Sequence, residues 1–448
     1  MATTLARQAT IHEGGSVPGA SQATGTGRPR GERTPFVVLA AIFFSCYLTW
    51  RPSMDLMFTL SDALFLLGLV VLVIHHRIPL EPMRFLTPFW LTGFGMLVVG
   101  LLIGSVGCPM PWRWLIVSGQ YLFAWVVLPL IVMRRGPDQT AQMLKAFTWG
   151  VFAMNLFGAI VWYTFTGTFD EAHARFGMDF LSGGRRLGAF TADANWNGAV
   201  LAMAVPAVFY LRAKKKVGNV LTLIWLPVLF LGVLLTASVT AFASCAAAVL
   251  TFMLVGGVRP SLRATTLLVA AGVLLGVVFF ESGGELPKIF VDRVGNAIDR
   301  GDITEAGTFE GRMQLIREAW GMVEQHMIVG VGADQYREIS ALKAPVHNMY
   351  LLLWVEGGLT AMFGWVLMMA VLLAAAIRAY PRDRLATALT FSTTVTFLIA
   401  SNASPHMYAR LWSVPVLIAL AASIEVALDV GPAQRRRSVL RQAETALP

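Results

Sequence analysis

Charged residues and cysteines are both scarce in this chain of 448 residues. Only 14% of the residues are charged, against about 25% in soluble domains, and 56% are apolar. The three cysteines stand far apart, which excludes a disulfide framework or a cysteine-rich metal site. There is also no HExxH motif, no acidic metal-binding motif and no P-loop, so we expect neither a metal nor a cofactor. The low share of charged residues excludes an ordinary soluble enzyme.

The sequence contains long apolar segments with few or no charged residues. Residues 217–258 carry no charge, and as one helix they would be about 63 Å long, twice the thickness of a bilayer core, so we divide this run at residues 236–240. The sequence then predicts an all-α polytopic membrane protein with about 12 transmembrane helices. Their expected ranges are 36–50, 54–74, 86–106, 114–133, 147–165, 188–211, 220–236, 238–256, 262–280, 348–377, 385–403 and 410–428.

The distribution of lysine and arginine predicts the topology. With the N-terminus inside, the inner segments hold 22 of these residues and the four short outer loops hold three, as the positive-inside rule requires. Because the net charge of +9 is divided among these small clusters, we expect no nucleic-acid partner. The expected organisation is a flexible cytoplasmic tail (1–34) without a signal peptide, nine spans (35–280) with an outer loop (166–187), a periplasmic loop (281–346), three spans (347–430) and a basic cytoplasmic tail (431–448).

The large periplasmic segment contains an amphipathic helix. Its apolar residues recur at spacings of three and four, at Met313, Ile316, Trp320, Val323 and Met327. The spacing predicts that this helix lies on the outer membrane surface or on the helical bundle.

His347 lies where this outer segment enters the tenth span, two residues after Pro345. Proline suits the first turn of a helix, so His347 is expected near a helix N-terminus. The helix dipole there disfavours a charged imidazole and attracts phosphate, which suits a neutral general base beside a phosphorylated substrate. The alternative is an interfacial histidine that only caps the span.

Arg185 and Arg186 stand at the head of the sixth span, followed by Asp193, Asn195 and Asn197. An arginine pair at such a place often only reaches toward lipid phosphates. The three polar residues, however, extend about two turns into an apolar helix, which indicates that they face a wet cavity.

Other polar residues have weaker signals. Arg312 opens the amphipathic helix and is either a phosphate-binding group or a solvated charge. Glu356 lies nine residues after His347, on the opposite helix face, and is interpreted as a buried structural acid. Ser118 and His406 allow an intramembrane serine protease, which the lack of a nucleophile elbow disfavours.

Three stretches of the chain resemble the bacterial superfamily of O-antigen ligases and O-antigen or exopolysaccharide polymerases. The motifs that carry the resemblance are Arg312–Trp320, Val329–Tyr336, His347–Leu351 and Glu356–Leu359, then Arg186–Phe190 with Asp193–Asn195, and Leu235–Ser238. One departure stands out: members often have Ser-Arg at the third stretch, whereas Val239 follows Ser238 here. Arg312, Arg293 or Arg185 could replace that arginine, and the change favours a polymerase slightly over a ligase.

The resemblance implies a metal-independent glycosyltransferase of the GT-C type in the bacterial inner membrane, with both termini in the cytoplasm and a periplasmic active site. Its donor would be a glycan on undecaprenyl diphosphate, its acceptor a glycan or the lipid A core, and its other partners membrane lipid and polysaccharide assembly proteins. The implied roles are His347 as the base, Arg186, Arg312 and Arg185 as diphosphate ligands, and Asn348, Asp193, Asn195 and Tyr350 as supporting residues.

Two other classes of function stay open from the residues alone. A transporter or lipid flippase also has about twelve spans, but should place its charges near the bilayer midplane in broken helices. A non-catalytic component of a polysaccharide export complex is the other alternative.

Overall fold

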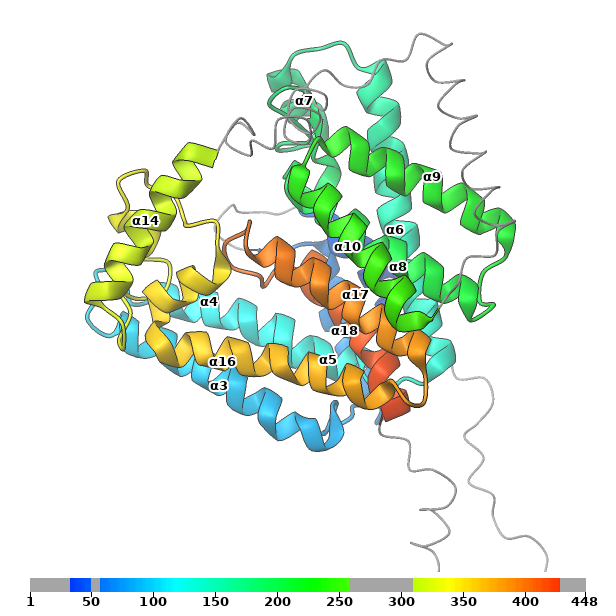
Figure 1. The fold of residues 1–448 in the computed structure, drawn as a ribbon, viewed down its shortest axis with the longest axis horizontal. Coiled ribbons are helices and arrows are strands. Elements are labelled where there is room, and N and C mark those ends of the chain that lie inside the picture. The colour runs from blue at the N-terminus through cyan, green and yellow to red at the C-terminus, as the bar shows by residue number, and fades with distance from the viewer. Residues whose placement is uncertain (1–32, 50–56, 258–308, 428–448) are drawn as a thin grey trace, which may run out of the picture. The chain divides into compact units, whose positions relative to one another are not determined.

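The computed structural model describes residues 33–49, 57–257 and 309–427 (Figure 1). Contacts divide the chain into two units, Met1–Arg33 and Thr34–Pro448, and the elements below belong to the second. Its first half contains α1 (Phe36–Phe43), η1 (Phe44–Cys46), α2 (Leu60–Ile74), η2 (Arg84–Leu86), α3 (Thr87–Ser105), α4 (Arg113–Leu122), the π-helical turn η3 (Phe123–Val127), α5 (Leu128–Val132), α6 (Pro137–Thr164) and α7 (Phe169–Phe176). The rest contains β1 (Leu181–Ser182), β2 (Arg186–Leu187), η4 (Ala189–Thr191), α8 (Ala194–Ala213), α9 (Asn219–Thr236), α10 (Val239–Gly256), α14 (Phe309–Gln325), α15 (Tyr336–Ile339), α16 (Met349–Ala379), α17 (Arg384–Ser401) and α18 (Arg410–Ala427).

The chain is a polytopic membrane protein. Within the described residues, eight helices are long and apolar enough to cross a bilayer: η2 with α3, α4 to α5, α6, α8, α9, α10, α16 and α18. Two shorter apolar helices, α1 with η1 and α2, coincide with the first two predicted spans. The eleventh predicted span is α17, whose many threonines and serines lower its mean hydropathy. The predicted span at 262–280 lies outside the described residues.

Two details were not specified by the sequence prediction. Within the helical fold, a short antiparallel hairpin of two-residue strands joins β1 to β2 and pairs Ser182 with Arg186. Helix α6 begins at Pro137, ten residues before the predicted span, because Pro137 suits a first helical turn and Asp138 favours the positive end of the helix dipole.

Helices α3 and α16 pack along each other over most of their length (Figure 1). Glycines make this close approach possible: a Cβ atom on Gly93 would stand 2.7 Å from the carbonyl oxygen of Gly364. A Cβ on Gly104 would stand 2.4 Å from the carbonyl oxygen of Glu356. Small residues at such interfaces allow the dense backbone packing that holds membrane helices together.

Helix α16 is interrupted at Gly358, where φ is +65°. The segment that follows α14 bonds to the backbone on both sides of the interruption. Before the interruption, the Val331 N–H donates to the Val355 carbonyl (2.8 Å), and after it the Leu359 N–H donates to the Met327 carbonyl (3.2 Å). These bonds satisfy backbone groups that a break within a membrane helix would otherwise leave without a partner.

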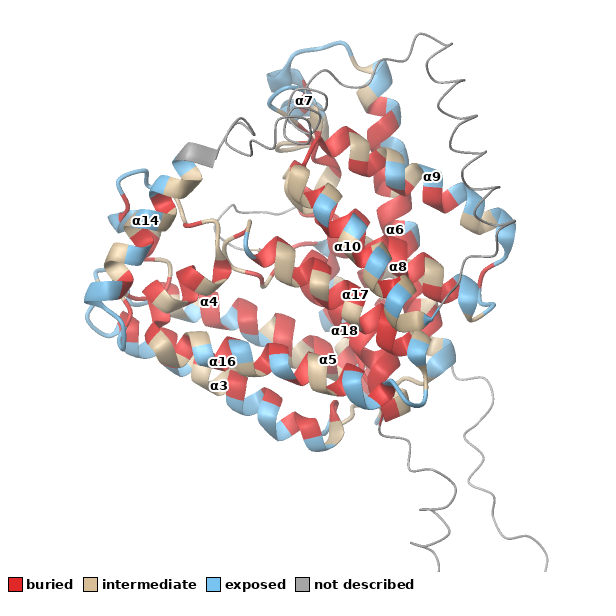
Figure 2. Ribbon diagram, viewed as in Figure 1, coloured by how far each residue is buried: buried red, intermediate tan, exposed pale blue. Residues whose placement is uncertain are grey.

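Helix α14 packs on the bundle through α16, one of the two predicted placements. Its buried face is centred on Leu315, Ala319 and Val323, which are at most 4% exposed. Figure 2 shows both buried and exposed residues along α14. Trp320 and Met327, which belong to the predicted apolar stripe, are half exposed. The face that contacts the bundle is therefore rotated by part of a turn from the predicted apolar stripe, because the small Ala319 allows the close contact.

Candidate functional site

Arg186 lies at the junction between α9 and α10. Its Nε atom donates to the Thr236 carbonyl oxygen at 2.9 Å, and its Nη2 atom donates to Asn195 Oδ1 at 2.8 Å. The Ser238 hydroxyl donates to the same Asn195 oxygen at 2.9 Å. A strand, the first turn of α8 and the break between two spans thus converge on one guanidinium group.

Asp193 forms the N-cap of α8. Its Oδ1 atom accepts hydrogen bonds from the backbone N–H groups of Asn195 (2.7 Å) and Trp196 (3.0 Å), which fixes the direction of the first turn. Asn197, one turn further, is fully buried and exchanges side-chain hydrogen bonds with Asn155 on α6. The expectation that Asn197 faces a wet cavity is therefore wrong, since its amide is satisfied inside the bundle.

Arg185 is directed elsewhere, although it is adjacent to Arg186. Its side chain is exposed and donates to the Trp162 carbonyl at 2.7 Å and to the Phe165 carbonyl, while its guanidinium lies 5.2 Å from the centre of the Trp162 ring. The C-terminal end of α6 thus holds Arg185, whereas the α9–α10 junction holds Arg186.

His347 is partly buried directly before α16, where it is influenced by two charges. Burial lowers the pKa of His347, the Arg312 guanidinium lowers it further, and the Asp193 carboxylate raises it in part. The imidazole is therefore held neutral at neutral pH, the form that accepts a proton. Within the described part of the chain, neither the His347 ring nor the Arg312 side chain has a hydrogen-bond or ion-pair partner.

The residues after His347 organise the start of α16. Asn348 is the N-cap and accepts from the Leu351 N–H at 3.0 Å, while its amide nitrogen donates to Asn402 at 3.3 Å. Tyr350 lies against Ser401 of α17. We call the group formed by Arg186, Asp193, Asn195, Ser238, Arg312 and His347 the outer cluster.

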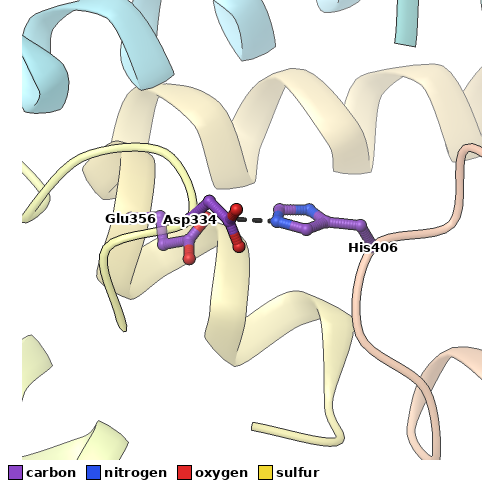
Figure 3. A group of neighbouring side chains, drawn as sticks. All are labelled: Asp334, Glu356 and His406. Atoms are coloured by element: carbon purple, nitrogen blue, oxygen red, sulfur yellow. Dashed lines mark ion pairs between the residues drawn. The ribbon is translucent and has the colours of Figure 1, made fainter. Parts of the chain in front are cut away.

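A second polar group lies beside the break in α16. His406 Nε2 pairs with Glu356 Oε2 at 3.2 Å, and His406 Nδ1 bonds to the Tyr121 hydroxyl at 2.9 Å. Asp334 stands beside this pair (Figure 3) and is held by Arg113 and by Arg337, whose Nε atom lies 3.1 Å away. We call Asp334, Glu356, His406, Arg113, Arg337 and Tyr121 the buried cluster.

The buried cluster contains a possible metal-ligand set that the motif search does not reveal. Single ligand atoms of Asp334, Glu356 and His406 lie within 4.8 Å of one another. Arg113 and Arg337 already neutralise Asp334, so a divalent cation would enter beside two guanidinium groups. The charges therefore fit a structural ion-pair network better than a metal site.

The contacts of Glu356 and His406 test two interpretations that the sequence suggested for these residues. Glu356 is 1% exposed and paired, in agreement with its interpretation as a buried structural acid. The nitrogen atoms of His406 contact Tyr121 and Glu356 and not Ser118, so the histidine needed by a serine protease is engaged elsewhere. Asp334 and Arg113 had no signal in the sequence, because they are distant from each other and from His406 along the chain.

Comparison with known proteins adds one family match. Residues 222–366 match the family model described as O-antigen ligase (Wzy_C), and no curated protein matches the chain. The matched range contains Ser238, Arg312 and His347, whereas Arg186 and Asn195 lie before it. This chain is a multi-pass membrane protein whose residues 222–366 match the O-antigen ligase (Wzy_C) domain family.

Proposed function

We propose that the protein transfers a glycan from undecaprenyl diphosphate to a sugar hydroxyl at the periplasmic face of the bacterial inner membrane, without a metal. The observation that carries this proposal is the outer cluster. Arg186 is held at the α9–α10 junction, and the pKa of His347 responds both to Arg312 and to Asp193 at the α8 N-terminus. The cluster thus combines an imidazole held neutral with arginine side chains, and Arg312 has no partner among the described residues. The family match supports the class of reaction.

The chemistry has two requirements that these residues meet. As the acceptor oxygen bonds to the anomeric carbon, the bond from that carbon to the diphosphate oxygen breaks and the diphosphate stays on the lipid. His347 takes the proton of the attacking hydroxyl. Arg186 and Arg312 stabilise the negative charge that develops on the leaving diphosphate, and arginine suits this because its planar group bonds two oxygens at once.

The position of Arg186 can explain how the protein functions with Val239 in the place where other members of the superfamily often have an arginine. Its Nε atom bonds to the Thr236 carbonyl, so its guanidinium lies at the same interhelical break where other members of the superfamily have Ser-Arg. Arg186 thus supplies a cation at this junction from a different element. Arg185 is engaged by α6, and Arg293 lies outside the described residues.

The acceptor divides the proposal into two forms, polymerase and ligase. We favour a polymerase, whose acceptor is a second lipid-linked repeat unit, over a ligase, whose acceptor is the lipid A core. The preference rests on Val239, since the ligase pattern has an arginine in that place. Polysaccharide assembly proteins are the expected partners in either case.

One observation favours the alternative of a transporter or flippase. Glu356 is buried two residues before the break at Gly358, and charged residues beside broken spans are typical of transport sites. The pairing of Glu356 with His406 favours a structural role instead, because transport sites require charges that are available to the substrate.

Reconstitution in liposomes with a defined lipid-linked repeat unit, with and without a lipid A core acceptor, distinguishes these functions. A polymerase lengthens the lipid-linked glycan and a ligase transfers it to the lipid A core, and His347→Ala removes either product while the protein remains inserted. The matched control is His326→Ala, which changes an exposed histidine at the end of α14. Movement of the donor across the bilayer without transfer of the glycan would instead identify a flippase. If neither donor movement nor glycan transfer occurs, the protein is a non-catalytic component of an export complex.

A further inference from the structure

Three successive apolar side chains protrude where the chain leaves α14. Met327, Ile328 and Val329 are 49%, 73% and 47% exposed. We call these three residues the apolar tip. They interrupt a predicted outer loop that is otherwise rich in charge, so their exposure needs an explanation other than contact with water.

Backbone hydrogen bonds fix the depth of the apolar tip along α16. The Leu359 N–H donates to the Met327 carbonyl at 3.2 Å, and the Val331 N–H donates to the Val355 carbonyl at 2.8 Å. A Cβ atom on Gly358 would stand 2.1 Å from the Ile328 carbonyl oxygen, so the tip is seated on the break itself. The tip therefore lies level with residues 355–359, two turns below the start of α16.

The length of α16 places that level in the bilayer. Its 31 residues make a helix of about 46 Å, whereas the hydrocarbon core is about 30 Å thick. Arg378 near the other end has its guanidinium 4.5 Å from the centre of the Phe85 ring, an arrangement expected at the inner interface. About 20 residues back from Arg378, the outer boundary of the hydrocarbon falls near Gly358.

Two tryptophans mark the same boundary. Trp320 on α14 is half exposed and lies edge-on to Trp354 on α16, with ring centres 5.8 Å apart. The Trp354 indole N–H donates to the Met327 carbonyl at 3.1 Å, which joins this aromatic pair to the apolar tip. Tryptophan is enriched at membrane interfaces because its ring is apolar and its N–H is polar.

The apolar tip also continues a surface that already faces lipid. Below the break, Phe363 and Val366 of α16 are 53% and 45% exposed, as expected for side chains against acyl chains. On α3, which packs along α16, Val99 and Ile103 are similarly exposed.

We propose that the apolar tip inserts into the outer leaflet and anchors the outer segment to acyl chains of the phospholipids, with Trp320 and Trp354 at the level of the headgroups. The occupant of this surface is therefore lipid, because the tip carries no charge, lies at the hydrocarbon boundary and continues a lipid-facing surface. Such an anchor holds α14, which carries Arg312, at a fixed height above the bilayer. This inference rests on the placement of α16 across the membrane and is independent of the reaction proposed above.

Fluorescence quenching in liposomes tests the anchor in the full-length chain. Cys46, Cys108 and Cys245 are replaced by alanine, and a single cysteine is introduced as Ile328→Cys and labelled with an environment-sensitive fluorophore. The matched control is Glu324→Cys, an exposed position on the last turn of α14. Each labelled protein is reconstituted in phosphatidylethanolamine and phosphatidylglycerol vesicles that contain a spin label either near the headgroup or in the middle of an acyl chain.

The expected result is a shift of the emission at position 328 to shorter wavelength, with stronger quenching by the shallow spin label than by the deep one and none by aqueous iodide. Position 324 should show quenching by iodide. Equal quenching of both positions by iodide would overturn the proposal in favour of an aqueous tip. Protection of position 328 from every quencher would overturn it in favour of a protein occupant, either residues 258–308 of this chain or another polypeptide. Val329→Cys provides the same test if the Ile328 variant does not fold.

Discussion

The two polar clusters use similar side chains in opposite ways. In the buried cluster each acid lies against a basic side chain: Glu356 against His406, and Asp334 against Arg113 and Arg337. In the outer cluster, His347 and Arg312 are partly buried, yet no described residue bonds to either side chain. A charge without a partner is costly in the absence of a ligand, so such groups are more typical of a binding site than of a structural contact.

The comparison also explains why burial alone does not locate a site. The buried cluster is better shielded from solvent, but its acids already lie against basic side chains of the same chain. The outer cluster has fewer internal bonds and a histidine whose pKa is lowered by burial and by the neighbouring Arg312. If this contrast is correct, substitutions in the outer cluster should affect turnover, and those in the buried cluster should affect stability.

Removing the proposed base should have the largest effect. We expect His347→Ala to lower the rate of glycan transfer by about 10³-fold or more, since general base catalysis contributes about 10²–10⁴-fold. The measurement is product formation by the purified protein, with thermal unfolding in detergent as the control for folding. An active His347→Ala enzyme, or an inactive one that also loses its fold, would remove the distinction between the two clusters.

The two adjacent arginines provide a matched pair for the second prediction. Arg186→Lys keeps the charge but loses the planar geometry that bonds Asn195, Thr236 and two phosphate oxygens, so we expect a loss of about 10²-fold in turnover. Arg185→Lys should leave turnover nearly unchanged, because Arg185 bonds to the end of α6. Equal losses in the two variants would contradict the assignment of Arg186 to the diphosphate.

The buried cluster should respond through stability. Glu356→Ala leaves His406 without its acidic partner in a buried place, which lowers the free energy of unfolding by about 3–5 kcal/mol. Asp138→Ala, which removes an exposed pair with Lys216, should leave the thermal stability nearly unchanged. A Glu356→Ala protein with unchanged thermal stability but no transfer activity would place this acid in the reaction instead.

Periodicity and charge were sufficient to predict most of the membrane helices. Eleven of the twelve predicted spans coincide with helices of the described residues, because an apolar run of the right length is a strong local signal. The apolar stripe of α14 did not specify which residues contact the bundle, since small residues such as Ala319 form close contacts that a hydrophobic pattern does not rank highly. The break at Gly358 was also missed, because its stability depends on residues 327–332.

The candidate site divides in the same way. Single residues such as His347 and Arg186 could be selected from sequence, because each stands beside a span boundary with other polar groups nearby. The residues that they contact could not be predicted from sequence. The bond from Arg186 to Thr236 joins residues 50 positions apart, and His406 and Asp334 meet only through tertiary packing.

The smallest predicted effect is a change in pH dependence, and it tests whether the outer cluster acts as one unit. His347 must be neutral to accept a proton, so activity rises as the pH increases through its pKa. Asp193→Asn removes the charge that raises this pKa, so the acidic limb of the kcat/KM profile should move to lower pH. Asparagine still caps α8, which keeps the helix intact. Arg312→Gln removes a charge that lowers the pKa, so the same limb should move to higher pH on top of its loss of rate. Shifts of opposite sign in the two variants require that both charges act on one imidazole, whereas a limb that stays in place in both would assign the titrating group to another residue.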